Sequence, residues 1–500
     1  MSAVNVAVLG VFALGSVLPS IRKFEIRRAT AWVLGAVLLF GFGSSFRALS
    51  GDVALVVNEY SRFGFMMKKS SLRELIRPVD ESGAQAANVD FVVHGEGEGT
   101  LPTLVPAPLV GKKPPIVIIL WDAARPDHMG CYGYERPTTP NLDAMAAESV
   151  IFEDAYSGAT ATTCGVRHLF TGRYSSRYML SQEHHPFFVH ELRKKGYRNF
   201  LITATGTDYN GVSLESFKRG GPPASDDGSV FQHLALHPQG LDRERPDAEK
   251  TGNVIKAWRD LVEKNGKDAL DGSLTFLHLT GAHFPWRNAN PLIDFGPSNI
   301  DLYDGEMVKV DALSKLALDT LKELGVYDDA IIMLVADHGT GLKEHGRWAG
   351  FLPYQEQIRV PLIMKVPGVT PRRVKAPVAT IDIAPTLMGI LDPGAKNIFD
   401  GVSLLPIATG KTDQLQRRYI TSLCAFEDAY SLIEDSGLKL HFHRRENYAL
   451  LFDLKNDPEE LVNLYDRQPE DRDRLLEMMR AFLWRGRDSY AHPYHYRGRK

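Results

Sequence analysis

Cysteine is scarce in this chain of 500 residues, which contains only Cys131, Cys164 and Cys424. Three widely separated cysteines cannot form a disulfide framework or a cysteine-based zinc module. A large excess of charge is also missing, because 58 basic residues stand against 61 acidic residues and leave a net charge of −3. This balance excludes a nucleic-acid-binding protein that works by bulk positive charge.

The rest of the composition is ordinary for a globular protein. Hydrophobic residues make up 44% and charged residues 24% of the chain, and the sequence has no internal repeat or low-complexity tract. These values exclude wholesale disorder, a collagen and a coiled coil. At about 100–200 residues per domain, we expect one large domain of catalytic size with additional segments.

The first 50 residues are unusually poor in charge. Residues 1–21 and 29–46 carry no charged side chain, and the basic segment 22–28 separates them. A helix of 18 residues is about 27 Å long, enough to span the hydrocarbon core of a membrane. We therefore expect two transmembrane helices within 1–50, with the basic loop in the cytoplasm and the remaining chain outside it. A cleaved signal peptide and a buried soluble hairpin are the alternatives.

The next two segments differ in character from the first. Residues 51–77 interleave aromatic, methionine and leucine side chains with lysine and arginine, as does an amphipathic helix on a membrane surface. An ordinary solvated helix explains the same pattern equally well. Residues 78–113 are rich in Gly, Pro, Ala and acids, which predicts a linker.

From residue 114 onward, continuous apolar runs alternate with helical patterns. The runs predict buried strands at 115–120, 199–204, 274–279, 330–336 and 360–366, and a further short strand is predicted at 150–156. This alternation predicts an α/β catalytic domain over 114–418, with a doubly wound, mixed but mostly parallel sheet flanked by helices. Short strands and a final helix predict a small C-terminal antiparallel subdomain over 419–500.

Acidic and imidazole side chains stand at the ends of three predicted strands. Asp122 follows the first strand, Asp337 and His338 follow the strand 330–336, and His278 and His283 lie within and just after 274–279. The carboxyl ends of parallel strands meet at one crevice, where such oxygen and nitrogen donors suit a divalent ion. The alternatives that need no metal ion are an aspartate that caps the next helix and a histidine that is buried in the core.

A cluster of hydroxyl side chains precedes a predicted helix after residue 156. Thr160, Thr162 and Thr163 stand where a loop enters that helix, whose N-terminus stabilises anionic oxygens. A threonine hydroxyl is a weak nucleophile unless a metal lowers its pKa and orients it. Spacing alone does not choose among these threonines, does not exclude Cys164, and leaves simple helix capping open.

The motifs resemble those of a known superfamily. Asp122-Ala-Ala-Arg-Pro-Asp-His128, Thr138–Asp143 and Asp337-His338-Gly339 are similar to metal-binding and helix-start segments of the alkaline phosphatase/sulfatase superfamily. The resemblance spans roughly residues 110–470 and is strongest to membrane-bound phosphoethanolamine transferases, with lipoteichoic acid synthases as more distant relatives. Fewer candidate spans, few cysteines and a sulfatase-like C-terminal part distinguish this chain from those transferases.

The resemblance implies a nucleophile and a ligand set. Thr160-Ala161-Thr162 resembles the transferase nucleophile segment, and the sulfatase frame Cys-x-Pro-x-Arg-x₄-Thr-Gly, aligned on Thr171-Gly172, also places the nucleophile at Thr162. It also implies one divalent ion, zinc with manganese or magnesium as alternatives, held by Asp122, Thr162, Asp337 and His338. The implied acid, base or positioning residues are His283, His278 and His345, although His345 is equally typical of a surface loop.

The function implied is head-group transfer. Thr162 would take a phosphoethanolamine-type or phosphoglycerol-type group from a phospholipid and pass it, through a phospho-threonine, to a glycan or lipid acceptor. The protein would then lie in the inner membrane, with its catalytic domain periplasmic and no nucleic-acid partner.

Other functions remain open at this stage. A sulfatase with Cys164 converted to formylglycine needs Cys-x-Pro-x-Arg, whereas the chain has Cys164-Gly-Val-Arg167. A phosphodiesterase that transfers its intermediate to water is a second alternative. A third alternative is a membrane-tethered scaffold protein without enzymatic activity. The complete set of candidate ligands disfavours it.

Overall fold

The computed structural model describes residues 99–174, 188–203, 230–233, 244–287, 290–346, 348, 352–415, 419–424, 429–443 and 448–488. The predicted transmembrane helices within 1–50, the predicted surface helix 51–77 and most of the predicted linker lie outside these residues. Among the described residues, no helix combines the length and the apolar character needed to cross a membrane.

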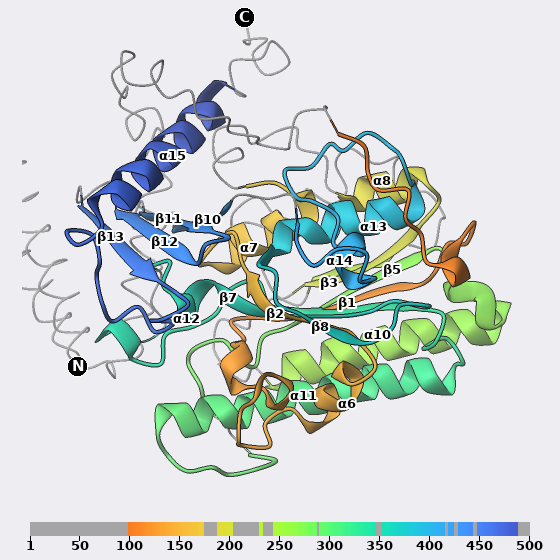
Figure 1. The fold of residues 1–500 in the computed structure, drawn as a ribbon. Helices are drawn as coiled ribbons and strands as arrows, with labels where there is room; N and C mark the ends of the chain where they lie inside the picture. The colour runs from red at the N-terminus through yellow and green to blue at the C-terminus, as the bar shows by residue number, and fades with distance from the viewer. Residues whose placement is uncertain are drawn as a thin grey trace, which may run out of the picture. The chain divides into compact units, whose positions relative to one another are not determined.

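A nine-stranded sheet forms the centre of the catalytic part (Figure 1). Its strand order is β4-β3-β5-β1-β6-β7-β2-β8, and β9 pairs with β2. Pairs are parallel except that β7 runs antiparallel to β6 and β2. The strands are β1 Ile116–Trp121, β2 Val150–Tyr156, β3 Arg198–Thr203, β4 Val230–His233, β5 Ser273–Leu279, β6 Ile331–Val335, β7 Arg359–Lys365, β8 Arg372–Val374 and β9 Val378–Ala379.

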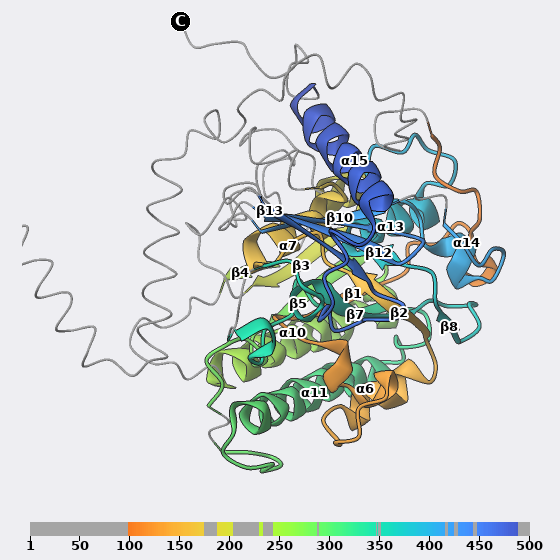
Figure 2. The same ribbon diagram turned by 60° about the vertical axis from the view of Figure 1, so that its left-hand side comes forward.

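Helices cover both faces of this sheet, which explains why its central strands are apolar throughout. All residues of β1, β5 and β6 are buried, as expected for strands that are enclosed on both faces. Figures 1 and 2 show α6, α10 and α11 on one face and α7, α8 and α13 on the other. These helices are α6 Pro140–Ala146, α7 Thr162–Thr171, α8 Phe188–Lys194, α10 Glu244–Asn265, α11 Asn299–Glu323 and α13 Ile383–Leu391.

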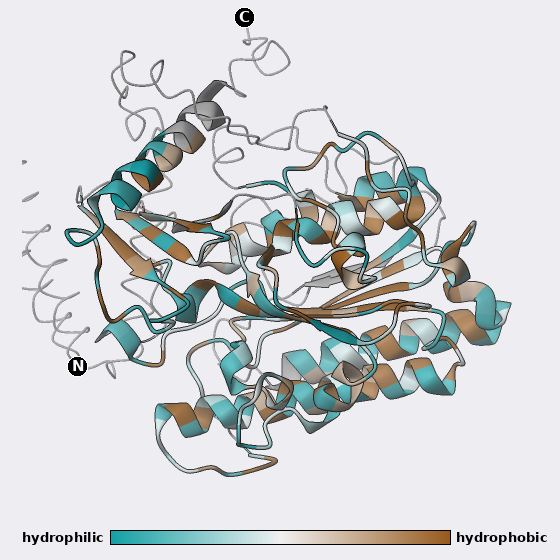
Figure 3. Cartoon of the chain, viewed as in Figure 1, coloured by the Kyte–Doolittle hydropathy of each residue, from teal (hydrophilic) through white to brown (hydrophobic). Residues whose placement is uncertain are grey.

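Figure 3 shows how hydropathy follows this layering. The strands of the large sheet are mostly hydrophobic, and helices α10 and α11 alternate hydrophobic and hydrophilic residues along their length.

Helix α11 begins with a capping box, in which the Ser298 side chain and the Asp301 carboxylate bond each other's backbone N–H groups. Such a box satisfies amide donors that have no partner within the helix.

A second, smaller sheet lies in the C-terminal part. It is antiparallel, with the order β10-β11-β12-β13, and helix α15 Pro469–Asp488 packs on it through a core that includes Leu440 and Leu475. Its strands are β10 Tyr419–Cys424, β11 Ala429–Glu434, β12 Leu438–His443 and β13 Tyr448–Asp453. The predicted α/β fold with a small C-terminal antiparallel sheet is therefore confirmed.

Candidate active site

Three neighbouring strands deliver acidic and imidazole side chains to one edge of the sheet. Asp122 directly follows β1, and Asp337 and His338 follow β6. His278 lies in β5, where it is in register with Leu120 of β1. Asp122, Asp337 and His278 are almost completely buried, so these charged or polar side chains face one another in place of solvent.

Thr162 reaches this cluster from helix α7, which packs on one face of the sheet (Figure 1). It is the first residue of α7, after the extended Ala161. Its Oγ1 lies 3.4 Å from each carboxylate oxygen of Asp122 and 3.1 Å from Nε2 of His338. The structure thus brings the predicted nucleophile to the predicted ligands.

A glycine permits this close approach of α7 to the loop after β6. A Cβ atom at Gly165 would overlap the backbone carbonyl of Asp337. Ser157, in the loop before α7, donates a hydrogen bond from Oγ to the same carbonyl oxygen. The backbone of Asp337 is therefore held from two sides by the segment that carries Thr162.

The distances from His338 Nε2 to three neighbouring donor atoms are close to those in a tetrahedral site for one divalent ion. Tetrahedral zinc with bonds of about 2.0–2.1 Å spaces its ligand atoms by about 3.3–3.4 Å. His338 Nε2 lies 3.6 Å from Asp122 Oδ1, 3.6 Å from Asp337 Oδ2 and 3.1 Å from Thr162 Oγ1. Asp337 Oδ2 is buried and accepts no hydrogen bond from the described residues, as expected of an oxygen that serves a cation. The side chains present therefore fit a metal ion.

The remaining contacts of the ligands orient them for this role. His338 Nδ1 lies 2.7 Å from the carbonyl oxygen of Gly339, so Nδ1–H donates there and Nε2 faces the ligand group. Asp337 Oδ1 accepts hydrogen bonds from the backbone N–H groups of Ala123 and His338. His338 and Asp337 thus each have one atom bonded to the backbone and another directed toward the shared site.

The charges of the cluster shift its pKa values in opposite directions. Burial raises the pKa of Asp122, but the neighbouring charges of His283, His278 and His338 outweigh it and leave the pKa below its ordinary value. Burial and the adjacent Asp122 carboxylate raise the pKa of Asp337. Burial opposes the charged form of His338, but Asp337 and Asp122 raise its pKa above the ordinary value. A cation would relieve this crowding of carboxylates.

The two histidines of the β5 segment have different surroundings. His278 is buried, its Nε2 lies 3.0 Å from Asp122 Oδ2, and it forms a second group of possible metal donors with Asp122 and Asp337. His283 is only half-buried, and it forms a group with Asp122 and His338 whose ligand atoms lie within 4.8 Å of one another. Its Nδ1 lies 2.5 Å from the carbonyl oxygen of Phe284, which makes Nε2 the nitrogen that can exchange a proton with a substrate.

His345 has contacts of another kind. Its Nδ1 lies 2.9 Å from Glu356 Oε1, its Nε2 lies 3.3 Å from the carbonyl oxygen of Glu460, and its ring stacks on Tyr354 at 3.8 Å. These contacts link the loop after β6 to the C-terminal part. A catalytic role for His345 stays a prediction.

Cys164 stands on a different side of α7 from the nucleophile. Two residues along an α-helix correspond to a rotation of about 200°, so side chains at positions 162 and 164 point in nearly opposite directions. Because Thr162 points into the ligand cluster, helix geometry predicts that the Cys164 side chain points away from it.

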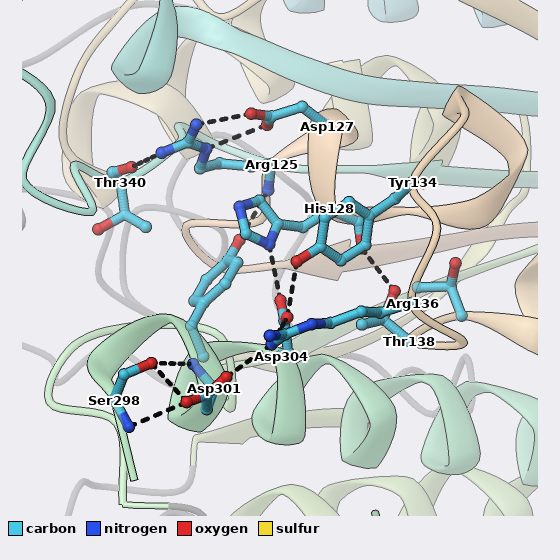
Figure 4. A network of polar contacts seen from close by, with 12 residues as sticks. Arg125, Asp127, His128, Tyr134, Arg136, Thr138, Ser298, Asp301, Asp304 and Thr340 are labelled. Atoms are coloured by element: carbon cyan, nitrogen blue, oxygen red, sulfur yellow. Dashed lines mark hydrogen bonds and ion pairs between the residues drawn. The ribbon is translucent and has the colours of Figure 1, made fainter. Parts of the chain in front are cut away.

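Sequence reasoning did not assign a role to Arg125, although it lies within the first quoted motif. Arg125 forms an ion pair with Asp127 at 2.6 Å and donates to the carbonyl of Thr340 (Figure 4). It also forms an ion pair with Glu344 at 2.8 Å. Arg125 therefore connects the loop after β1 to the loop after β6, and each of these loops carries candidate metal ligands.

A second network fixes the same β1 loop to α11. His128 Nδ1 lies 2.6 Å from Asp304 Oδ1, and Tyr134 and Arg136 both donate to Asp304 Oδ2 (Figure 4). Because Asp304 is fully buried, these donors satisfy a carboxylate that would otherwise be costly to bury.

Comparison with known proteins agrees with this fold and site. Residues 114–393 match the protein family described as Sulfatase, and residues 343–487 match the domain described as N-sulphoglucosamine sulphohydrolase, C-terminal. The fold is that of the alkaline phosphatase superfamily, whose prediction is confirmed. Within it, the chain belongs to the Sulfatase family.

Individual relatives have low identity. Choline-sulfatase of Rhizobium meliloti is 32% identical over 178 residues, which is 33% of this chain and 34% of that protein. Ulvan-active sulfatase of Formosa agariphila is 23% identical over 445 residues, covering 77% and 85%. The structure of a 2-O GAG sulfatase superposes with a TM-score of 0.60 at 18% identity, covering 76% and 94%. These relatives are sulfatases, so they support the superfamily but not the narrower resemblance to phosphoethanolamine transferases.

Proposed function

We propose that this protein is a metal-dependent hydrolase of sulfate esters, or of chemically similar phosphate esters, with Thr162 as its nucleophile. The observation that carries the proposal is the position of Thr162 Oγ1, within 3.4 Å of Asp122 and 3.1 Å of His338. The relatives named above act on sulfate esters, and the ulvan-active and GAG enzymes favour a sulfated saccharide as the substrate.

The donor set proposed for the ion consists of Asp122, Asp337, His338 and Thr162. Two carboxylates, one imidazole and one hydroxyl suit zinc, with manganese or magnesium as alternatives. A bound divalent ion would lower the pKa of the Thr162 hydroxyl and neutralise charge on the ester oxygens.

The side chains of the chain itself supply the remaining steps. The Thr162 hydroxyl first loses its proton to solvent; Oγ then bonds to the sulfur or phosphorus atom, and the bond from that atom to the leaving alcohol oxygen breaks. The N-terminus of α7 offers its positive end to the anionic group. His283 Nε2 donates a proton to the departing oxygen and then takes one from the water that releases Thr162. His278 keeps Asp122 in place throughout.

Turnover of model esters by the zinc-loaded protein tests the proposal. We expect release of 4-nitrophenol from 4-nitrophenyl sulfate, a slower release from 4-nitrophenyl phosphate, and a drop of about 10³-fold or more for Thr162→Ala. Mass spectrometry of the quenched reaction should place a sulfo or phospho group on Thr162. Turnover that survives in Thr162→Ala would show that another group is the nucleophile.

A second candidate function is head-group transfer, and the residue at position 162 itself favours it. Aligned on Thr171-Gly172, the frame Cys-x-Pro-x-Arg places Thr162, Cys164 and Val166 at its Cys, Pro and Arg positions. A threonine hydroxyl suits a covalent phospho intermediate. In this case the donor is a phospholipid, the acceptor a glycan or lipid, and the enzyme is anchored in the inner membrane with its catalytic domain outside the cytoplasm.

Vesicles of phosphatidylethanolamine or phosphatidylglycerol distinguish transfer from hydrolysis. Transfer predicts diacylglycerol release that increases when an acceptor glycan or lipid is added, and a head group attached to that acceptor. Hydrolysis of sulfate esters predicts no diacylglycerol with either vesicle.

A further inference from the structure

A buried ion pair lies on α10, beneath the end of β5. Lys250 Nζ is 2.6 Å from Asp247 Oδ1, and the two side chains are 0% and 2% exposed. By contrast, Lys256 and Asp260 form a pair on the same helix that is 73% and 59% exposed. A buried ion pair is costly unless further hydrogen bonds satisfy both ions. The hydrogen-bond partners of Asp247 and Lys250 therefore indicate which segment the pair stabilises.

Those partners all belong to the segment that carries the two site histidines. Lys250 Nζ donates to the carbonyl oxygen of His278 at 3.0 Å. Asp247 Oδ2 accepts from the backbone N–H groups of Thr280 and Gly281 at 2.7 and 2.8 Å, and Oδ1 accepts from the Thr280 hydroxyl at 3.1 Å. The pair therefore contacts the backbone immediately after His278 and shortly before His283.

Neighbouring groups make this turn rigid from the other side. A Cβ atom at Gly281 would lie 2.7 Å from Val310 on α11, so the turn is wedged between α10 and α11. The N–H of His283 donates to the carbonyl of Thr280 at 3.0 Å, which closes the turn. Any shift of Thr280 and Gly281 is therefore passed to His283.

We propose that Asp247 and Lys250 are positioning residues, which fix His278 against Asp122 and His283 beside the metal ligands. The inference rests on the proposed function for its catalytic consequence, but its effect on metal binding does not depend on the substrate. β5 ends at Leu279, so the next N–H groups have no strand partner, and the Asp247 carboxylate supplies one. Lys250 neutralises that carboxylate, so the turn gains its acceptor without adding negative charge beside Asp122 and Asp337.

The decisive variant removes both charges and keeps the side-chain volumes: Asp247→Asn with Lys250→Met. Replacing a buried pair as a unit leaves no unpaired charge, so we expect a folded protein with a thermal midpoint close to wild type. Zinc affinity, measured by competition with a chelator, should fall about 10-fold. The kcat for the ester should fall while KM changes little, because His283 acts on the leaving group. The control is Lys256→Met with Asp260→Asn on the same helix, which should match wild type in each measurement.

A folded double variant with wild-type zinc affinity and kcat would overturn the inference. If the double variant does not fold, Thr280→Val removes only the hydroxyl contact to Asp247 and should shift zinc affinity and kcat in the same direction by a smaller factor. Wild-type values for Thr280→Val would then refute the positioning role. If wild-type protein binds zinc but hydrolyses no ester, the proposed function fails, and the zinc affinities still decide the role of the pair.

Discussion

His278 Nε2 lies 3.0 Å from Asp122 Oδ2, whereas His338 Nε2 approaches the other oxygen of the same carboxylate at 3.6 Å. The two oxygens of Asp122 therefore have separate partners, one from β5 and one from the loop after β6. An imidazole that donates to a ligand carboxylate fixes its orientation and raises its affinity for the ion.

The first prediction concerns this contact. His278→Ala should weaken zinc binding about 10–100-fold, because Asp122 loses the group that orients it. His278→Gln should retain part of the affinity, since its side-chain amide can also donate. Chelator competition at constant pH measures both values. Wild-type affinity in folded His278→Ala would assign the imidazole to packing alone.

The second prediction separates the two candidate nucleophiles of α7. Cys164→Ala should retain wild-type ester turnover, because position 164 points about 200° away from Thr162 around the helix. Peptide mass spectrometry of the wild type should find unmodified cysteine at 164. A formylglycine at that position, or loss of turnover in Cys164→Ala, would favour a sulfatase that uses Cys164 and exclude Thr162 as the nucleophile.

The third prediction tests the close packing of α7 on the metal loop. Gly165→Ala should reduce both turnover and zinc affinity, because the added Cβ would overlap the carbonyl of Asp337 and push Thr162 away from its partners. Gly252→Ala on α10 is the matched control, since a Cβ there meets nothing within 4 Å and alanine favours a helix by about 1 kcal/mol. Equal turnover and equal zinc affinity in the two variants would show that the site tolerates a displacement of α7.

Much of the sheet could be predicted because buried parallel strands consist of continuous apolar runs. The segments 115–120, 274–279 and 330–336 correspond to β1, β5 and β6 within one or two residues. β4 Val230–His233, β8 Arg372–Val374 and β9 Val378–Ala379 were missed because they are too short to show a pattern. Helix α10 begins at Glu244, but its first turns are mainly charged and lack an apolar stripe, so the sequence pattern does not show where it starts.

Asp122, Asp337 and His338 could be identified because each stands just after a recognisable strand, whereas Thr162 at the start of α7 was identified from the resemblance. Contacts between distant loops could not be identified in this way. The ion pair of Arg125 with Glu344 joins residues 219 positions apart, and the surroundings of His345 include Glu460 of the C-terminal part. Likewise, Asp247 and Lys250 look like ordinary surface charges of a helix in sequence, since nothing local shows that their side chains are buried.

The fourth prediction is a pH dependence at His345. Burial alone would lower the pKa of His345, but its hydrogen bond and charge interaction with Glu356 raise it above the ordinary value. The charged pair therefore stabilises the fold fully below the unfolded-state pKa of about 6.5, and this contribution is lost as pH rises through the raised folded-state pKa. His345→Gln should lower the free energy of unfolding more at pH 6 than at pH 9, as measured with denaturant. A difference independent of pH would show that only the stacking on Tyr354 matters.

The last prediction concerns the attachment of the small sheet. Lys439 Nζ lies 2.6 Å from Glu460 Oε1 with both side chains fully buried, and Glu460 Oε2 accepts from the N–H of Gln355 at the start of α12 Gln355–Ile358. Lys439→Met leaves the carboxylate without its cation and should destabilise the protein by about 3–5 kcal/mol, whereas adding Glu460→Gln should recover most of the loss. Asp413→Asn, which breaks an exposed pair with Arg372, should cost about 1 kcal/mol or less. Denaturant unfolding compares the three. Lys439→Met as stable as Asp413→Asn would mean that water reaches Glu460, so that the buried Lys439 does not help to hold Glu460 at Gln355.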